Sequence, residues 1–138
     1  MSPHQIRFNN QTWKTAEALF QALRFNDETV IDEIRASHSP MTAKMIAKRN
    51  KLKMVVQPVS DQDLINMQLV LKLKIEQHCD LRRMLLTTKD SIIIEDCSKR
   101  RASPWGAQLI NGKWVGDNLL GKLWMDLRES TQAAITCQ

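Results

Sequence analysis

Apolar and polar residues alternate with two different periods along the chain, which predicts a mixture of short strands and helices. Near the start, Ile6 and Phe8 alternate with polar residues, and Asn9-Asn10 is a suitable tight-turn pair before Thr12-Trp13. Residues 5–14 are therefore predicted to form a hairpin. A helical period follows over residues 16–26, with Thr15 as a suitable N-cap.

Capping residues mark where the later helices begin. Ser39 followed by Pro40 is a strong start, because serine caps and proline is tolerated in the first turn. Ser60 and Asp63 resemble a capping box in front of the longest periodic segment. Further helices are expected over 27–34, 39–48, 60–77, 80–86 and from Asp117 or Asn118 to about Glu129. The core stripe predicted for the longest is Leu64, Met67, Leu71 and Ile75.

One segment is rich in β-branched residues. Residues 91–95 read Ser-Ile-Ile-Ile-Glu, and this is the clearest strand signal in the chain. With the helices above, it predicts a helix-rich α+β fold with a small β-sheet. The 138 residues fit a single domain, 1–138, whose tail from 130 to 138 is weakly specified and expected to fray.

Composition narrows the class of protein. Three cysteines, none two or three residues apart, indicate neither a disulfide framework nor a paired zinc site. The first residues are too polar for a signal peptide, and no apolar run reaches the length of a membrane span. We therefore expect a cytoplasmic monomer without membrane contact, or a nuclear protein if the host is eukaryotic. The net charge of +5 is compatible with nucleotides or nucleic acid as partners.

Glycine and tryptophan are concentrated in one stretch. All four glycines and three of the four tryptophans fall between Trp105 and Trp124, behind a basic loop at residues 98–101. Glycine permits close approach to a backbone, and tryptophan offers a flat face. The stretch is compatible with a pocket for a flat, anionic ligand and equally with a glycine-rich turn beside a core helix.

Two residues could carry proton or covalent chemistry. Lys74 falls at the margin of the predicted core stripe, where loss of hydration would leave more of its amine uncharged. A lysine that extends its stem over the core and its amine into water is the more common outcome. Glu17, with Gln21 and Arg24, makes a polar row that is ordinarily a solvated face, but a carboxylate opposite Lys74 would form an acid–base pair.

Metal and cofactor motifs are absent from the sequence. His4, His38 and His78 have no ligand-like spacing with one another or with the cysteines, so no metal site is expected. No G-x-G-x-x-G follows a strand, and there is no P-loop, so no dinucleotide or triphosphate cradle is expected and no cofactor is assigned.

Several motifs in order resemble those of the NADAR family. The match covers essentially the whole chain, and the order and spacing of its motifs are specific. The motifs are Trp13-Lys14-Thr15-Ala16-Glu17, Phe20-Gln21-Ala22, Lys74, Leu85-Leu86-Thr87-Thr88, Trp105-Gly106 and Asn118-x-Leu120-Gly121-Lys122-x-x-Met125-x-x-Arg128.

The resemblance implies an N-glycosidase that removes ADP-ribose from guanine bases in DNA or RNA. It implies that Lys74 attacks the anomeric carbon and forms a Schiff base, with Glu17 as its proton-transfer partner. It places these residues in the substrate pocket: Trp13, Gln21, Trp105, Gly106, Asn118 and Gly121. Arg24 and Lys48 are further candidates for substrate binding. The basic loop adds Lys99, Arg100 and Arg101 as nucleic-acid contacts, because anionic groups favour them.

The chain also departs from the family pattern. Family members usually carry an aromatic and Ser-Asn segment before the equivalent of Ser2-Pro3-His4, and many have aspartate where this chain has Ala102. Three other interpretations therefore stay open. They are a glycosidase of ribosylamino-pyrimidine intermediates of riboflavin biosynthesis, an ADP-ribose-binding module that has lost catalysis, and a basic nucleic-acid binder without a nucleotide pocket.

Overall fold

A computed structural model describes residues 4–136. The chain forms two compact units, Met1–Cys79 and Asp80–Gln138. Six α-helices and two separate two-stranded antiparallel sheets occur within the described residues, so the predicted helix-rich α+β class is confirmed. No helix of residues 4–136 has the length and apolarity needed to cross a membrane.

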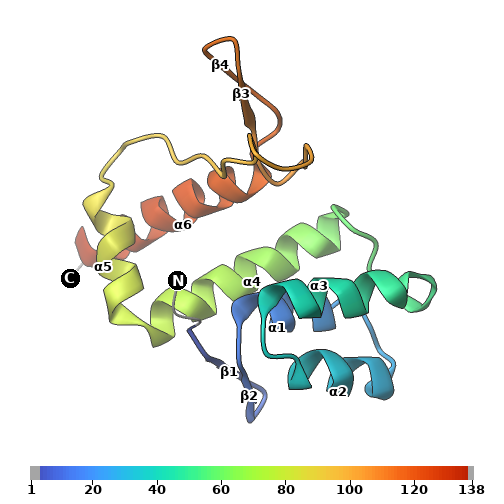
Figure 1. Ribbon diagram of the computed structural model, residues 1–138. Coiled ribbons are helices and arrows are strands. Elements are labelled where there is room, and N and C mark those ends of the chain that lie inside the picture. The colour runs from blue at the N-terminus through green and yellow to red at the C-terminus, as the bar shows by residue number, and fades with distance from the viewer. Residues whose placement is uncertain (1–3, 137–138) are drawn as a thin grey trace. The chain divides into compact units, whose positions relative to one another are not determined.

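The first unit is a hairpin followed by four α-helices and a short 3-10 helix (Figure 1). Helix α1 packs against α2, α3 and α4, and α4 also contacts β1. Completely buried Ile6, Leu19, Ile34 and Val70 contribute to the core of this unit. The elements are β1 (Ile6–Phe8), β2 (Gln11–Trp13), α1 (Ala16–Ala22), α2 (Glu28–Ala36), α3 (Pro40–Arg49), the short 3-10 helix η1 (Lys51–Lys53) and α4 (Asp61–Gln77).

The predicted starts of this unit's elements are confirmed. Asn9 and Asn10 both take positive φ between the paired strands β1 and β2. Thr15 accepts a hydrogen bond from the Ala18 N–H, Ser39 from the Thr42 N–H and Ser60 from the Asp63 N–H. Each side chain satisfies a donor that a helix N-terminus leaves unpaired.

Two details of the helices differ from the prediction. Helix α1 ends at Ala22 rather than near residue 26, because the Arg24 carbonyl accepts hydrogen bonds from the Val55 and Val56 N–H groups. The buried face of α4 is also rotated, since Leu64 and Met67 are only partly buried. The residues of α4 that are buried are Asp63, Asn66, Val70, Leu71 and Ile75.

The second unit contains two helices and a hairpin. Its elements are α5 (Cys79–Thr87), whose first residue closes the first unit, β3 (Gln108–Ile110), β4 (Lys113–Val115) and α6 (Leu119–Thr136). Helix α6 continues beyond the predicted end at Glu129, so residues 130–136 are helical, while 137 and 138 lie outside the described residues. The β3–β4 hairpin, which extends away from α6 in Figure 1, was not predicted.

The predicted strand at 91–95 is wrong. The backbone there is extended but pairs with no strand among residues 4–136, because side chains take its hydrogen bonds. The Asn118 amide accepts from the Glu95 N–H and donates to the Ile93 carbonyl, both at 2.9 Å. Arg128 donates to the Ser91 carbonyl at 2.7 Å. Just after this segment, Asp96 and Ala107 form an isolated parallel β-bridge.

A buried ion pair joins α4 to the segment that follows α1. Arg24 Nε and Nη2 donate to the two carboxylate oxygens of Asp63 at 2.9 and 2.8 Å, and Asp63 is completely buried. Asp63 also accepts from the Val59 N–H, and Arg24 Nη1 donates to Gln21. The Arg24 guanidinium lies 4.7 Å from the Phe20 ring centre. A bidentate pair of this kind fixes both distance and orientation.

We predict that Asp63→Asn lowers the free energy of unfolding by about 3–5 kcal/mol, because it leaves the Arg24 cation buried without its counter-charge. Urea denaturation followed by circular dichroism measures this. The matched control is Glu76→Gln, which removes an exposed partner of Lys72 at 3.9 Å and should cost about 0–1 kcal/mol. Equal losses for the two variants would contradict the role given to the buried pair.

Candidate active site

A half-buried amine and a carboxylate share an environment in the first unit. Lys74 lies near the end of α4, on the same side as buried Val70 and one residue before buried Ile75. Burial lowers the pKa of the Lys74 ammonium, and the charge of Glu17 opposes this by raising it. Lys74 is therefore more easily deprotonated than an exposed lysine, and Glu17 is close enough to influence it. The two residues singled out from sequence are brought together.

Glu17 has a second cationic neighbour. Lys44 Nζ on α3 lies 3.2 Å from Glu17 Oε1, and the exposed fractions of their side chains are 50% and 20%. Glu17 occupies the first turn of α1, where unpaired N–H groups favour a negative charge. Lys44 was not predicted from the sequence, because nothing in the pattern of α3 indicates which helix it meets. The exposed Lys48, one turn further along, makes no hydrogen bond or ion pair with these two side chains in the described part of the chain.

The other predicted residues of α1 support the helix itself. Gln21 and Arg24 are both buried, and their side chains are bonded to each other. All three guanidinium nitrogens of Arg24 donate to Asp63 or Gln21. In this structure these residues therefore position α1, which carries Glu17, relative to α4, which carries Lys74.

Trp13 is buried beneath the start of α1. It is 3% exposed, so its ring faces the protein interior. Its Nε1–H is buried and has no hydrogen-bond partner among the described residues. An unpaired buried donor of this kind costs about 1–3 kcal/mol.

Close packing explains two of the predicted glycines in the second unit. A Cβ at Gly106 would collide with the Glu95 carbonyl, and one at Gly121 with the Ile93 carbonyl. Asn118, with φ of +52°, uses its side-chain amide to accept from the Glu95 N–H and to donate to the Ile93 carbonyl. Gly106, Asn118 and Gly121 thus hold the extended segment 93–95 against α6.

A shallow cavity lies in the same stretch. Its volume is about 260 Å³, and its lining includes Ser103, Pro104, Gly106, Gly116 and Asp117. Trp105 is partly buried, and its carbonyl accepts the Leu120 N–H at the start of α6. Two glycines of the glycine-tryptophan stretch line this hollow, but none of its tryptophans does, so a pocket with a tryptophan face stays a prediction.

The basic loop is attached to strand β3. Ser98 Oγ accepts the Leu109 N–H at 2.8 Å, and the Gln108 side chain donates to the Arg100 carbonyl at 2.9 Å. Lys99 and Arg101 are exposed, whereas Arg100 is paired with Glu95 at 2.9 Å.

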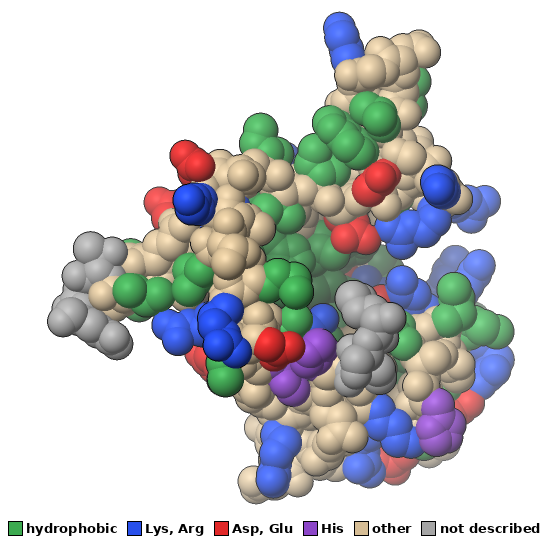
Figure 2. Space-filling view, turned by 60° about the vertical axis from the view of Figure 1, so that its left-hand side comes forward, with side chains coloured by type: hydrophobic (Ala, Val, Ile, Leu, Met, Phe, Trp, Pro, Cys, Tyr) green, Lys and Arg blue, Asp and Glu red, His purple; other side chains and the backbone are tan. Residues whose placement is uncertain are grey.

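The unpredicted hairpin carries exposed apolar side chains beside this loop. Leu109 and Trp114 are cross-strand partners, 51% and 45% exposed. Hydrophobic side chains are visible on the hairpin at the top of Figure 2, with a basic side chain at its tip. Asn111-Gly112 forms the turn, and this pair was the signal that could have revealed the hairpin.

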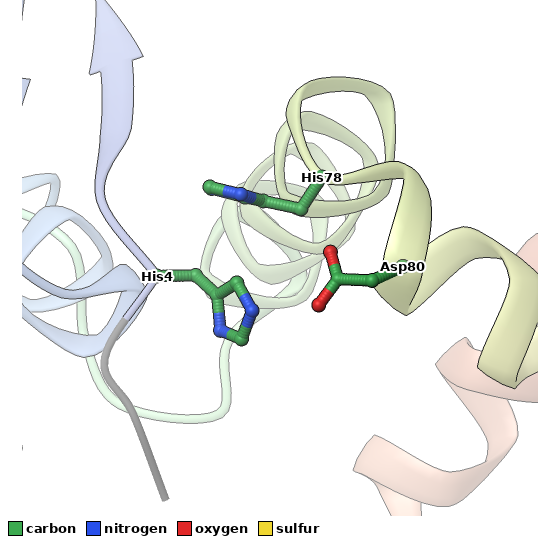
Figure 3. Close-up of side chains that lie close together, drawn as sticks. All are labelled: His4, His78 and Asp80. Carbon is green, nitrogen blue, oxygen red and sulfur yellow. The ribbon is translucent and has the colours of Figure 1, made fainter.

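Two histidines without ligand-like spacing come together where α4 ends. The His4 and His78 rings make an edge contact with centres 4.7 Å apart. His78 Nε2 is also 2.5 Å from the Gln5 carbonyl oxygen. Figure 3 shows the side chains of His4 and His78 next to each other. Sequence spacing did not predict this group.

Comparison with known proteins identifies the class. The NADAR domain matches residues 1–132, so the chain belongs to the NADAR family. It is 38% identical over 126 residues to N-glycosidase YbiA of Shigella boydii and 37% identical to that of Escherichia coli, covering 90% of this chain and 74% of each relative. It is 32% identical to an N-glycosidase of Nostoc punctiforme, covering 93% and 80%.

A solved structure supports the fold. The NMR structure of the E. coli protein YbiA superposes with a TM-score of 0.78 at 35% identity, covering 96% of this chain and 74% of that one. The family identified from the sequence motifs is thereby confirmed, as is the α+β fold that the resemblance implied.

Proposed function

We propose that this protein is an N-glycosidase that removes ADP-ribose from guanine bases of nucleic acid through a Schiff base on Lys74. The observation that carries the proposal is the half-buried Lys74 amine, whose pKa is lowered by burial, within the influence of the Glu17 carboxylate. A neutral amine is a nucleophile, and a carboxylate can exchange protons with it. Membership in a family whose named relatives are N-glycosidases supports the bond type.

The chemistry follows from these two groups. Lys74 Nζ forms a bond to ribose C1 as the C1–N bond breaks, and the base leaves with a proton. Glu17 accepts the proton lost by the attacking amine and returns it to the base. The ribose ring then opens as the proton remaining on Nζ moves to the ring oxygen, and C1 becomes the carbon of a Schiff base. Water adds to that carbon, releasing the sugar and restoring the amine.

The second unit suggests the substrate class. Lys99 and Arg101 present exposed charge on a loop that is hydrogen-bonded to the hairpin bearing exposed Trp114. Positive charge favours phosphate groups, and an exposed aromatic face allows an unpaired base to stack. This combination favours nucleic acid over a small pyrimidine intermediate carrying a single phosphate.

A two-substrate assay tests the proposed function. We expect release of ADP-ribose from an ADP-ribosylated guanine oligonucleotide to exceed hydrolysis of a ribosylamino-pyrimidine phosphate, and Lys74→Ala to lose at least about 100-fold in turnover. Lys72→Ala, an exposed lysine on the same helix, is the matched control and should retain turnover. Faster turnover of the pyrimidine would favour the riboflavin-type activity. Tight ADP-ribose binding without release would indicate an inactive binding module.

We predict that the double variant Lys99→Ala/Arg101→Ala weakens binding of an unmodified single-stranded oligonucleotide. The slope of log affinity against log salt should become shallower by about 1.4, since each lost phosphate contact removes about 0.7. Fluorescence anisotropy at several salt concentrations measures the slope. Arg82→Ala/Arg83→Ala removes the same charge from exposed positions of α5 and should leave it nearly unchanged. Equal slopes for both double variants would count against the basic loop as the nucleic-acid contact.

A further inference from the structure

Two lysines from different helices compete for one carboxylate. Glu17 on α1 forms an ion pair with Lys44 on α3 at 3.2 Å, and its charge also acts on Lys74 on α4. Helix α1 packs directly against both α3 and α4. The chemistry proposed for Lys74 needs an uncharged amine, whereas an unshared carboxylate beside it would favour the ammonium form.

We propose that Lys44 is a positioning residue of the active site, which binds the Glu17 carboxylate and so keeps the Lys74 amine available as a nucleophile. This inference rests on the proposed function of Lys74. Lys44 disfavours the ammonium form of Lys74 in two ways. Its ammonium occupies one carboxylate oxygen that could otherwise pair with Lys74, and its positive charge disfavours a second ammonium nearby.

Several of the other charges around these helices are paired with one another. Asp63 on α4 is bound by Arg24. Arg24 is the other charged residue of the polar row that begins with Glu17. The charged pairs that link neighbouring elements lie elsewhere: Glu33 of α2 with Arg49 of α3, and Asp27 before α2 with Lys53 of η1. Strand β2 contributes no ionisable side chain, and Arg7 of β1 meets Gln77 through its backbone. Among the described residues, Lys44 is thus the ion-pair partner of the Glu17 carboxylate.

The geometry separates this role from a structural one. The Lys44 side chain is half exposed, and pairs of this kind contribute little to the free energy of unfolding. Removing its charge should therefore leave the fold intact while changing the protonation of Lys74. If Lys44 only stabilised α3, removing its charge would lower the free energy of unfolding and leave the protonation of Lys74 unchanged.

The test measures the ionisation of Lys74 directly in the full-length protein. Trace acetylation with acetic anhydride at a series of pH values, followed by peptide mass spectrometry, reports the fraction of each lysine that is uncharged. In the unsubstituted protein we expect Lys74 to react at lower pH than exposed Lys72 on the same helix, because burial lowers the pKa of Lys74. In Lys44→Met, which keeps the side-chain stem, the acetylated fraction of Lys74 at neutral pH should fall about three- to tenfold.

Matched variants assign the effect. Lys51→Met removes an exposed charge just after the end of α3 and should leave the Lys74 profile unchanged. Lys44→Arg should restore it, since arginine keeps the charge. In a Glu17→Gln background, Lys44→Met should lose most of its effect, because the carboxylate that Lys44 holds is gone.

An unchanged or more acidic Lys74 profile in Lys44→Met would overturn the inference. So would an equal shift in Lys51→Met. Neither result depends on catalysis, because the acetylation test measures ionisation whereas the two-substrate assay measures turnover. If Lys74→Ala retained turnover, the proposed function would fail even if Lys44 controlled the Lys74 amine.

Discussion

The candidate site depends on the buried pair of Arg24 and Asp63. Arg24 follows helix α1, and Asp63 lies in the first turn of α4, so the pair fixes how the two helices meet. The carbonyl of Arg24 also ends α1 by accepting the N–H groups of Val55 and Val56. Replacing an ion pair with apolar residues is often neutral for stability, but its bidentate geometry sets orientation in a way that apolar contacts do not. That orientation brings Glu17 and Lys74 within reach of each other's charge.

The protonation of Lys74 depends on a balance between burial and the charges of its neighbours, and no single group sets it alone. Burial of Lys74 favours the free amine, and the carboxylate of Glu17 favours the ammonium. A nucleophilic lysine with a proton-transfer partner needs both influences, with burial the larger. Lys44 provides a means of reducing the second without removing the carboxylate. The three groups come from three helices, so the arrangement is a product of tertiary packing.

Local signals predicted much of the fold, because caps and turns depend on neighbouring residues. Thr15, Ser39 and Ser60 cap the helices expected of them. The strand expected at 91–95 failed because the Asn118 amide, distant in sequence, takes the hydrogen bonds that a strand would use. Sequence singled out Lys74 and Glu17 but missed Lys44, since an ion pair between helices leaves no periodic trace. The Asn111-Gly112 pair is a local hairpin signal, but the β3–β4 hairpin was not predicted from it.

The central claim is that Lys74 becomes covalently attached to the sugar during turnover. The most direct measurement is borohydride reduction of the protein while it turns over ADP-ribosylated guanosine, followed by peptide mapping. The account predicts a reduced sugar adduct on the peptide containing Lys74 and none in Lys74→Ala. Continued turnover with no trapped adduct, or an adduct on another lysine, would contradict it.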